Sequence, residues 1–305
     1  MTTAIIITII ASFLWGVTNH IDKFMISSVS ESGNSVKTLL VFSTLVAGLV
    51  FAPFWLIFSK FSVSISMISL ISIFLAGLMY LLATYLYFKA LENNDASIVV
   101  IMFQLIPVFS YIISLIFFKE NLTIQQIIGS LIIILSAIII SFDFEEKNKE
   151  SKFKALILMI LSSLFFAIYF ILFDVSIRNS PYNSCVFWYQ IGIALIGIVL
   201  MSMKSFRTTF LSAVKTNGKR YFSLNLLNEI INLIANALVN FANLTIPIAL
   251  ANVLNGFQGV FVFILGAIGV KLLPKYFKEN LTKKIVFQKV SCIVLSIVGL
   301  IVMFI

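Results

Sequence analysis

The hexapeptide FKENLT occupies residues 118–123 and occurs again, unchanged, at residues 277–282. Each copy precedes the last long apolar stretch of one half of the chain. The most charged linker, DFEEKNKESK at residues 143–152, lies between the two halves, close to the midpoint. This matched placement favours an internal duplication. We therefore predict two repeats, residues 1–147 and residues 148–305.

The composition of the 305-residue chain excludes an ordinary soluble fold. Hydrophobic residues make up 61% and charged residues 11%, against about 45–50% and about 25% in soluble domains. Apolar stretches between polar breaks predict ten helices, each long enough to cross about 30 Å of hydrocarbon. They are expected at residues 3–26, 36–58, 66–90, 96–118, 123–142, 152–177, 184–203, 221–244, 247–272 and 283–305. We expect an all-α integral membrane protein with ten transmembrane helices, which excludes nucleic-acid readers and soluble enzymes.

The number of helices in each repeat sets the direction of the second repeat. Because five is odd, the second repeat enters the membrane in the opposite direction to the first. The result is two inverted five-helix repeats, the layout of many secondary transporters. In such proteins the substrate site lies near the middle of the membrane, between the repeats.

Trp15 and Gly16 open a set of residues, continued by Asn19 and Lys23, that resembles the first helix of EamA-type transporters in the drug/metabolite transporter superfamily. A second similar set crosses the third to fifth helices: Tyr87, Ala90, Leu91, Ala96, Pro107, Glu120 and Gly129. The second half keeps Ala249, Glu279 and Leu281 but replaces the proline region with Asn255-Gly256-Phe257-Gln258. The resemblance implies a ten-helix carrier that moves small metabolites by alternating access, often as an exporter.

The predicted eighth helix carries seven polar residues on one face. Their spacings of 3, 1, 3, 4, 4 and 3 residues place them within an arc of about 120°. They are Asn225, Asn228, Glu229, Asn232, Asn236, Asn240 and Asn243. Because amides in hydrocarbon are costly without partners or water, we expect this face to line a wet substrate cavity. The alternative is a hydrogen-bonded seam between helices.

Two ionisable residues are candidates for carrying a coupling proton. Glu229 lies about nine residues into its predicted helix, where it could also be the counter-ion of a cationic substrate. The alternative is a structural residue that is either neutral or paired with an asparagine. His20 is the sequence's only histidine, and its proton-relay role competes with a simple packing role.

Residues of other predicted helices complete the expected substrate site. Four aromatic residues could approach the cavity and form an aromatic cage, which suits a quaternary amine: Trp15, Tyr80, Tyr85 and Tyr87. Amides expected at a similar depth are Asn252, Asn255 and Gln258 on the predicted ninth helix and Gln104 on the fourth. The predicted site therefore contains Trp15, Asn19, Tyr80, Tyr87, Gln104, Asn228, Glu229, Asn232, Asn236 and Asn255.

The repeated hexapeptide carries a glutamate in each copy. Glu120 and Glu279 lie just before predicted helices, and a carboxylate at that position gains from the helix dipole, typically 0.3–1 kcal/mol. We expect both to act as caps of the helices that follow them.

The orientation of the chain stays open. Under ten spans, most Lys and Arg residues fall in the loops opposite the termini. The positive-inside rule then places both termini outside, whereas the family resemblance implies cytoplasmic termini.

We predict a secondary transporter that moves a small polar metabolite, with an amino acid or amine as first candidate, through a central cavity by alternating access. The alternative within transport is a multidrug exporter of lipophilic cations. A membrane-embedded enzyme is disfavoured by one histidine, two cysteines in apolar stretches and no acidic pair at ligand spacing. Short loops and a one-sided polar face argue against an ion channel.

We expect no catalytic residue, metal or cofactor, and no nucleic-acid partner. The expected partners are the small-molecule substrate, the lipid bilayer and, as a candidate, a coupling proton. The protein is expected to work as a monomer or homodimer in a bacterial plasma (inner) membrane.

Overall fold

The computed structural model describes residues 2–29, 35–117, 123–142, 149–242, 254–277 and 279–304. Glu120, Asn243, Ala249 and Asn252 lie outside these residues, and the side chain of Asn240 is not described. The chain divides into two compact units. The first unit comprises Met1–Phe24, Tyr87–Ser163 and Ile230–Ile305, and the second comprises Met25–Leu86 and Leu164–Glu229. Each unit takes residues from both predicted repeats, whose boundary and inverted relation stay predictions.

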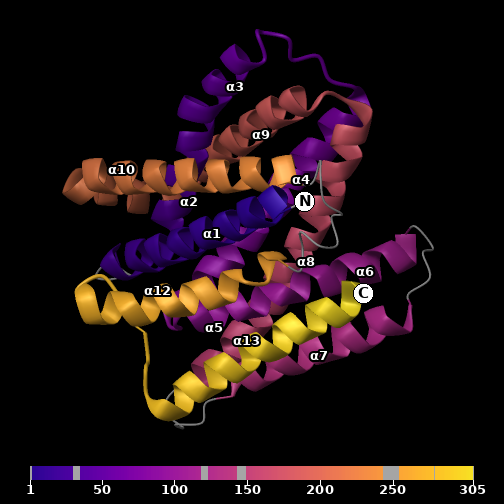
Figure 1. Ribbon diagram of the computed structural model, residues 1–305. Coiled ribbons are helices and arrows are strands. Elements are labelled where there is room, and N and C mark those ends of the chain that lie inside the picture. The colour runs from indigo at the N-terminus through magenta and orange to yellow at the C-terminus, as the bar shows by residue number, and fades with distance from the viewer. Residues whose placement is uncertain are drawn as a thin grey trace. The chain divides into compact units, whose positions relative to one another are not determined.

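The described residues form helices and no strands (Figure 1). Nine helical segments among them are long and apolar enough to cross a membrane, and α12 (Gln258–Leu272) is a shorter apolar helix. This confirms the predicted all-α membrane fold, with ten as an approximate span count. The remaining single helices are α1 (Thr2–Val29), α4 (Met67–Glu92), α7 (Ile124–Ser141), α8 (Lys149–Asn179), α9 (Tyr182–Ser202), α10 (Lys204–Ala242) and α13 (Lys283–Phe304).

Two predicted helices are divided by irregular turns. The first consists of α2 (Ser35–Val46), the π-helix η2 (Ala47–Phe51) and α3 (Ala52–Phe58). The second consists of α5 (Ala96–Ile101), the 3₁₀-helix η3 (Met102–Gln104) and α6 (Leu105–Phe117). Pro107 follows η3, and a proline cannot donate to the carbonyl four residues before it, which loosens the helix at that point. The hydroxyl of Ser163 donates to the carbonyl of Met102 at 3.4 Å.

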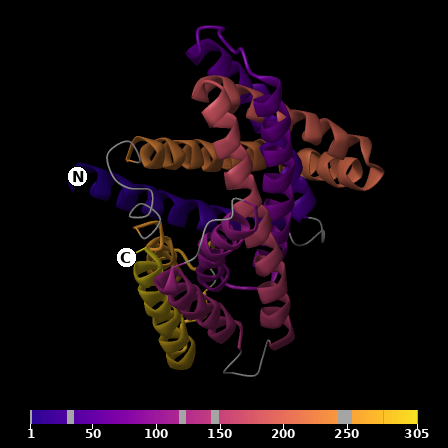
Figure 2. The same cartoon turned by 90° about the vertical axis from the view of Figure 1, so that its right-hand side faces the viewer.

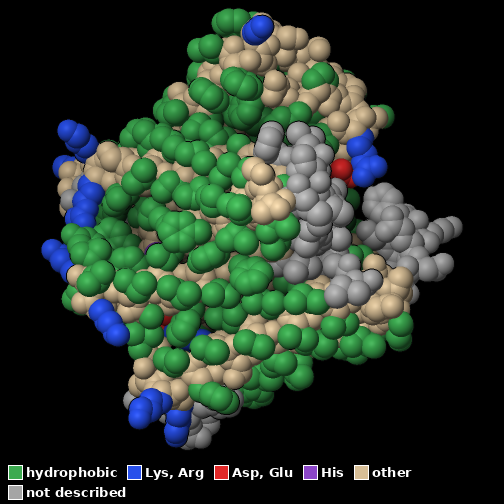
Figure 3. All heavy atoms as spheres, in the orientation of Figure 1, with side chains coloured by type: hydrophobic (Ala, Val, Ile, Leu, Met, Phe, Trp, Pro, Cys, Tyr) green, Lys and Arg blue, Asp and Glu red, His purple; other side chains and the backbone are tan. Residues whose placement is uncertain are grey.

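Helix α13 has an apolar exposed side. Large hydrophobic side chains are exposed at intervals of three or four residues, at Phe287, Val290, Val294, Val298 and Ile301. This spacing forms one apolar stripe along the helix. Figure 3 shows hydrophobic side chains over much of this face of the protein, with Lys and Arg side chains at its margins. Both features fit a helix surrounded by lipid.

Helices α7 and α13 lie side by side in the first unit (Figures 1 and 2). A Cβ atom on Gly129 would lie 2.5 Å from the carbonyl oxygen of Gly299, so the two backbones touch. Further along, the hydroxyl of Ser136 donates to the carbonyl of Cys292 at 2.8 Å. Residue numbers rise on one helix as they fall on the other, so the pair is antiparallel. Small residues permit this close packing within a membrane.

Helix α10 of the second unit begins earlier than predicted. Residues 204–220 were expected to be a loop because they are charged, but they form the first turns of one 39-residue helix. Phe210 and Tyr221 pack against Val41 and Phe42 of α2. The Lys and Arg side chains occupy the exposed side. The segment is therefore an amphipathic extension, and its apolar span begins near the predicted place, at Gly218.

Candidate functional site

The polar face of α10 begins with side chains bonded to α2 in the second unit. Nδ2 of Asn225 donates to Oγ of Ser43 at 2.9 Å. The Ser43 hydroxyl also hydrogen-bonds the Glu229 carboxyl group. Asn225 and Asn228 are buried, at 2% and 3% exposed. This end of the face has the bonding expected of an interhelical seam.

Farther along α10 the polar side chains keep accessible surface. Glu229 and Asn232 are partly exposed and Asn236 is exposed. The Asn236 side chain donates to the carbonyl of Asn232 at 2.8 Å. An amide that bonds its own helix in this way needs no neighbouring helix. This part of the face is therefore available to solvent or a ligand.

Three tyrosines from different helices form a triangle in the second unit. The ring centroid of Tyr80 lies 5.4 Å from that of Tyr169 and 6.0 Å from that of Tyr189. The rings of Tyr169 and Tyr189 lie 5.9 Å apart, and their hydroxyl groups are hydrogen-bonded. Tyr189 also interacts electrostatically with Glu229. We call Tyr80, Tyr169, Tyr189 and Glu229 the tyrosine–glutamate cluster.

Tyr169, Tyr189 and Glu229 lie deep in the protein, yet all four members of the tyrosine–glutamate cluster keep part of their surface accessible. A carboxylate beside aromatic faces has the chemistry that recognises a cation, through charge and through the ring quadrupole. Sequence reasoning named Tyr80 and Glu229 but missed Tyr169 and Tyr189. Neither missed residue belongs to a polar stripe, so the sequence held no signal that separates them from lipid-facing aromatics.

In the first unit, Asn19 and Tyr87 lie together as members of one polar network. Nδ2 of Asn19 donates to the Tyr87 hydroxyl at 2.8 Å, and that hydroxyl donates to Oδ2 of Asp22 at 3.2 Å. Nε2 of Gln258 donates to Oδ1 of Asn19 at 2.8 Å. The network joins α1, α4 and α12. Asp22 and Gln258 were outside the predicted site.

Three other predicted site residues are Trp15, Gln104 and Asn255. Trp15 on α1 is partly exposed, and Gln104 in η3 is buried. Oδ1 of Asn255 is buried and has no hydrogen-bond partner among the described residues. A buried amide oxygen without a partner is costly, so Asn255 is suited to accept a hydrogen bond from a ligand or water.

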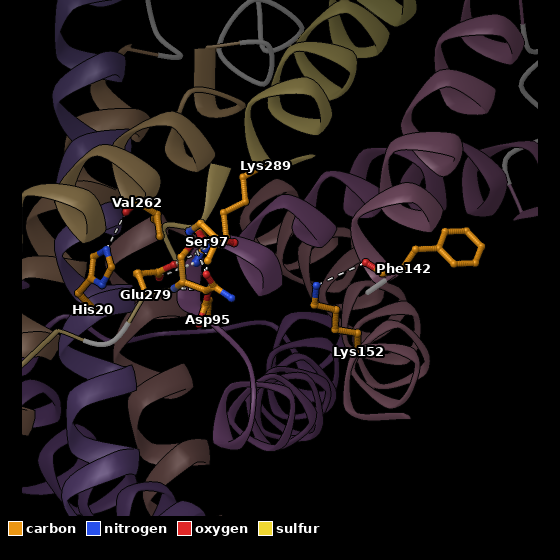
Figure 4. Close-up of polar contacts among 10 residues, drawn as sticks. His20, Asp95, Ser97, Phe142, Lys152, Val262, Glu279 and Lys289 are labelled. Atoms are coloured by element: carbon orange, nitrogen blue, oxygen red, sulfur yellow. Dashed lines mark hydrogen bonds and ion pairs between the residues drawn. The ribbon is translucent and has the colours of Figure 1, made fainter. Parts of the chain in front are cut away.

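A fully buried lysine marks a second polar centre in the first unit (Figure 4). Nζ of Lys289 on α13 lies 2.6 Å from Oδ2 of Asp95, 2.7 Å from Oε2 of Glu279 and 3.1 Å from the carbonyl oxygen of Asn280. Glu279 also accepts hydrogen bonds from the backbone and hydroxyl groups of Ser97, at 3.2 and 2.7 Å. We call these five residues the Lys289 cluster.

The expected role of Glu279 is corrected by this geometry. Its carboxyl group binds the backbone of Ser97 at the start of α5, not the start of the helix that follows it. In the first copy of the hexapeptide the described cap is Thr123, which forms a capping box with Gln126. The signal for this centre was Lys289 itself, since a charge within a predicted span is a functional candidate.

His20, a predicted coupling candidate, lies near the Lys289 cluster. Its Nε2 lies 2.8 Å from the carbonyl oxygen of Val262. A carbonyl only accepts, so Nε2 carries the proton. The imidazole packs against the ring of Phe277, with 5.0 Å between centroids.

Long apolar helices that enclose amides, tyrosines and paired charges define an integral multi-pass membrane protein. Residues 2–142, slightly less than half of the chain, match the model of the EamA-like transporter family. The match confirms the resemblance predicted from the sequence. It indicates a membrane transporter of the drug/metabolite transporter superfamily, whose members work with a small-molecule substrate in a lipid bilayer.

The chain was also compared with curated proteins and with solved structures. The comparison with curated proteins gave no match. One solved structure, described as the crystal structure of a protein, is similar at 13% sequence identity, with 96% of this chain and 94% of the other covered and a TM-score of 0.47.

Proposed function

We propose that this protein is a secondary transporter that moves a small polar metabolite with an amine group by alternating access through a central cavity. The proposal rests on the tyrosine–glutamate cluster. Glu229 supplies the negative charge, and the rings of Tyr80, Tyr169 and Tyr189 supply faces for the cationic group. Asn232 and Asn236 hydrogen-bond the polar remainder of the substrate.

The same cluster favours a second candidate, the export of lipophilic cations. Aromatic side chains bind large cations through cation–π contacts without needing amide partners. The two candidates differ in what the asparagines do. In the amine carrier they bind substrate, and in the lipophilic-cation exporter they only keep the face wet.

A thermal-shift screen of the purified protein tests both candidates. The panel contains alanine, putrescine, choline, glucose, uridine and tetraphenylphosphonium. A ligand at 100 times its Kd contributes about 2.7 kcal/mol of stability. We expect alanine, putrescine or choline to raise the unfolding temperature of the wild type, and Glu229→Gln and Asn232→Leu to lose that shift.

A matched control uses a carboxylate outside the cluster. Glu92 forms a local ion pair with Lys89 at 2.9 Å, so Glu92→Gln should keep the shift. A shift with tetraphenylphosphonium alone, retained in Asn232→Leu, supports the lipophilic-cation exporter. Stabilisation by glucose or uridine that survives Glu229→Gln contradicts both.

A further inference from the structure

We infer that Asp95 and Glu279, held on either side of the Lys289 ammonium, form a proton-binding site that takes up and releases one proton. This site is separate from Glu229. Its use as the coupling site of a transport cycle rests on the proposed function, but the binding of the proton does not.

The first argument is the charge of the Lys289 cluster. One ammonium group faces two carboxyl groups, so the fully ionised cluster carries one unbalanced negative charge. The side chains are 0% exposed for Lys289, 2% for Glu279 and 20% for Asp95. An uncompensated charge in such a place is strongly unfavourable. One bound proton makes the cluster neutral.

The second argument is the hydrogen bonding. All three N–H groups of Lys289 are used, by Asp95, Glu279 and the Asn280 carbonyl. Oδ2 of Asp95 also accepts from the backbone N–H of Asn280 at 2.9 Å. Within the described part of the chain, Lys289 is the cation that both carboxyl groups contact, so they share its charge. Glu279 can therefore hold the proton while Asp95 stays paired with Lys289.

The exposures of the two carboxyl groups provide a route for the proton. Asp95 keeps accessible surface, whereas Glu279 is sealed. The accessible side of the cluster is therefore the side of Asp95, from which a proton reaches the inner carboxyl group of Glu279. In Figure 4 both carboxyl groups lie at the same lysine and the hydroxyl of Ser97 points to Glu279.

The groups that face Glu279 come from four elements. They are Lys289 on α13, Asp95 and Ser97 at the start of α5, His20 on α1 and the backbone of α12 at Gly266. A Cβ atom on Gly266 would lie 2.7 Å from Cγ of Glu279 and 3.1 Å from Cε1 of His20. The imidazole and the carboxyl group thus share the space above this glycine. His20 interacts electrostatically with both Lys289 and Asp95.

The electrostatic balance of Glu279 agrees with this geometry. Burial raises the pKa of the Glu279 carboxyl, and the nearby Asp95 charge raises it further, while Lys289 and Ser97 act in the opposite direction. The net direction is upward, which is that of a carboxyl group able to keep a proton when ordinary carboxyl groups have lost theirs.

Infrared titration of the purified full-length protein tests the site without any substrate. The readout is the C=O band of a protonated carboxyl group, followed from the acid range to pH values well above the ordinary glutamate pKa of about 4.3. Glu229 is another carboxyl group deep in the protein, so every protein in this test carries Glu229→Gln. In that background the otherwise wild-type protein should show a band of one carboxyl group that persists above that range and then disappears. Glu279→Gln and Asp95→Asn should each abolish this late step, because either change leaves one ammonium with one carboxylate.

Lys289→Met sharpens the test, since the buried Glu279 carboxyl then lacks its cation. Its late band should persist to a higher pH than in the wild type. Glu92→Gln is the control and should leave the band unchanged. A wild type without a late band, or a late band that survives in both Glu279→Gln and Asp95→Asn, overturns the proposal.

The proton site and the transporter proposal fail separately. If the late band changes in these variants as expected but no compound of the thermal-shift panel binds, the proton site stands and the proposed substrate class is wrong. If an amine binds and the late band is absent, the substrate class stands and the proton site is wrong.

Discussion

Oε2 of Glu279 lies 2.7 Å from Nζ of Lys289, and neither side chain exposes more than 2% of its surface. The pair of Arg178 and Asp174 has the same separation, 2.7 Å, but these side chains are 74% and 49% exposed. Two ion pairs of equal length therefore differ in surroundings. Exposed pairs contribute little to stability, whereas a buried charge that loses its partner is strongly unfavourable.

Lys289→Met should destabilise the folded protein by about 3–5 kcal/mol at neutral pH, the cost of leaving a buried charge without its partner. The measurement is thermal unfolding in detergent. Arg178→Met should change stability by no more than about 0.5 kcal/mol, the worth of an exposed i,i+4 pair. Equal effects of the two changes would show that Lys289 is not enclosed as described.

Stability should depend on pH through Glu279. Its folded-state pKa is raised by burial, so the folded state holds the proton more tightly than the unfolded state. The stability contributed by the protonated group is fully present below the unfolded pKa of about 4.3 and is lost as pH rises through the folded value. Unfolding temperatures measured across this window should fall, and Glu279→Gln should flatten the decline. A steeper decline in that variant would contradict the assignment.

Tyr87→Phe should cost about 1–3 kcal/mol of stability. The change removes the hydroxyl that accepts from Asn19 and donates to Asp22, and it leaves buried polar groups unsatisfied. Tyr85 lies two residues earlier on α4, is partly exposed and has no described hydrogen bond. Tyr85→Phe is therefore the control, expected within about 0.5 kcal/mol of the wild type. Denaturation curves measure the free energy of unfolding of the two variants, and equal values for both would contradict the prediction.

Tyr80→Leu should weaken choline binding about 2- to 30-fold, since a cation–π contact contributes about 0.5–2 kcal/mol. Titration calorimetry provides the affinity. Trp55 is also aromatic but packs against the rings of Phe54 and Phe58 on α3, so Trp55→Leu should leave the affinity unchanged. If Tyr80→Leu binds choline as tightly as the wild type, Tyr80 does not contact the bound cation.

Gly129→Ala should destabilise the pair of α7 and α13 by about 1–3 kcal/mol, because the added methyl group meets backbone atoms that cannot rotate away. Gly218 lies in α10, where the nearest atom to an added methyl group is 3.0 Å away on a side chain, that of Val214, and not on a backbone. Gly218→Ala should be neutral or slightly stabilising, because alanine favours a helix. Thermal unfolding of the two variants should therefore move in different directions.

Apolar runs were enough to predict the helical membrane fold. They did not predict the helix at residues 204–220, where a charged segment forms the beginning of α10. The extension packs Phe206 and Phe210 against α2, and two separated aromatics among many charges produce no apolar run. An amphipathic pattern search is the sequence signal that fits such a segment.

The site was predictable only as far as one helix at a time. The spacing of the asparagines on α10 identified a polar face but not the partner of Asn225, which is Ser43, 182 positions away. The contact of Gln258 with Asn19 joins residues 239 positions apart. Periodicity within a helix carries no information about which helix lies opposite, so Tyr169 and Asp95 could not be assigned to their clusters.

The packing of α7 against α13 limits how the first unit can move. Gly129 and Gly299 bring the two backbones into contact, Ser136 bonds the carbonyl of Cys292, and Gln288 bonds two carbonyls at the end of α7, each at 2.7 Å. Sliding one helix along the other would drive backbone atoms together and break these bonds at once. The two helices therefore move as one rigid body. A change in the shape of the first unit must take place at the contacts between its other helices.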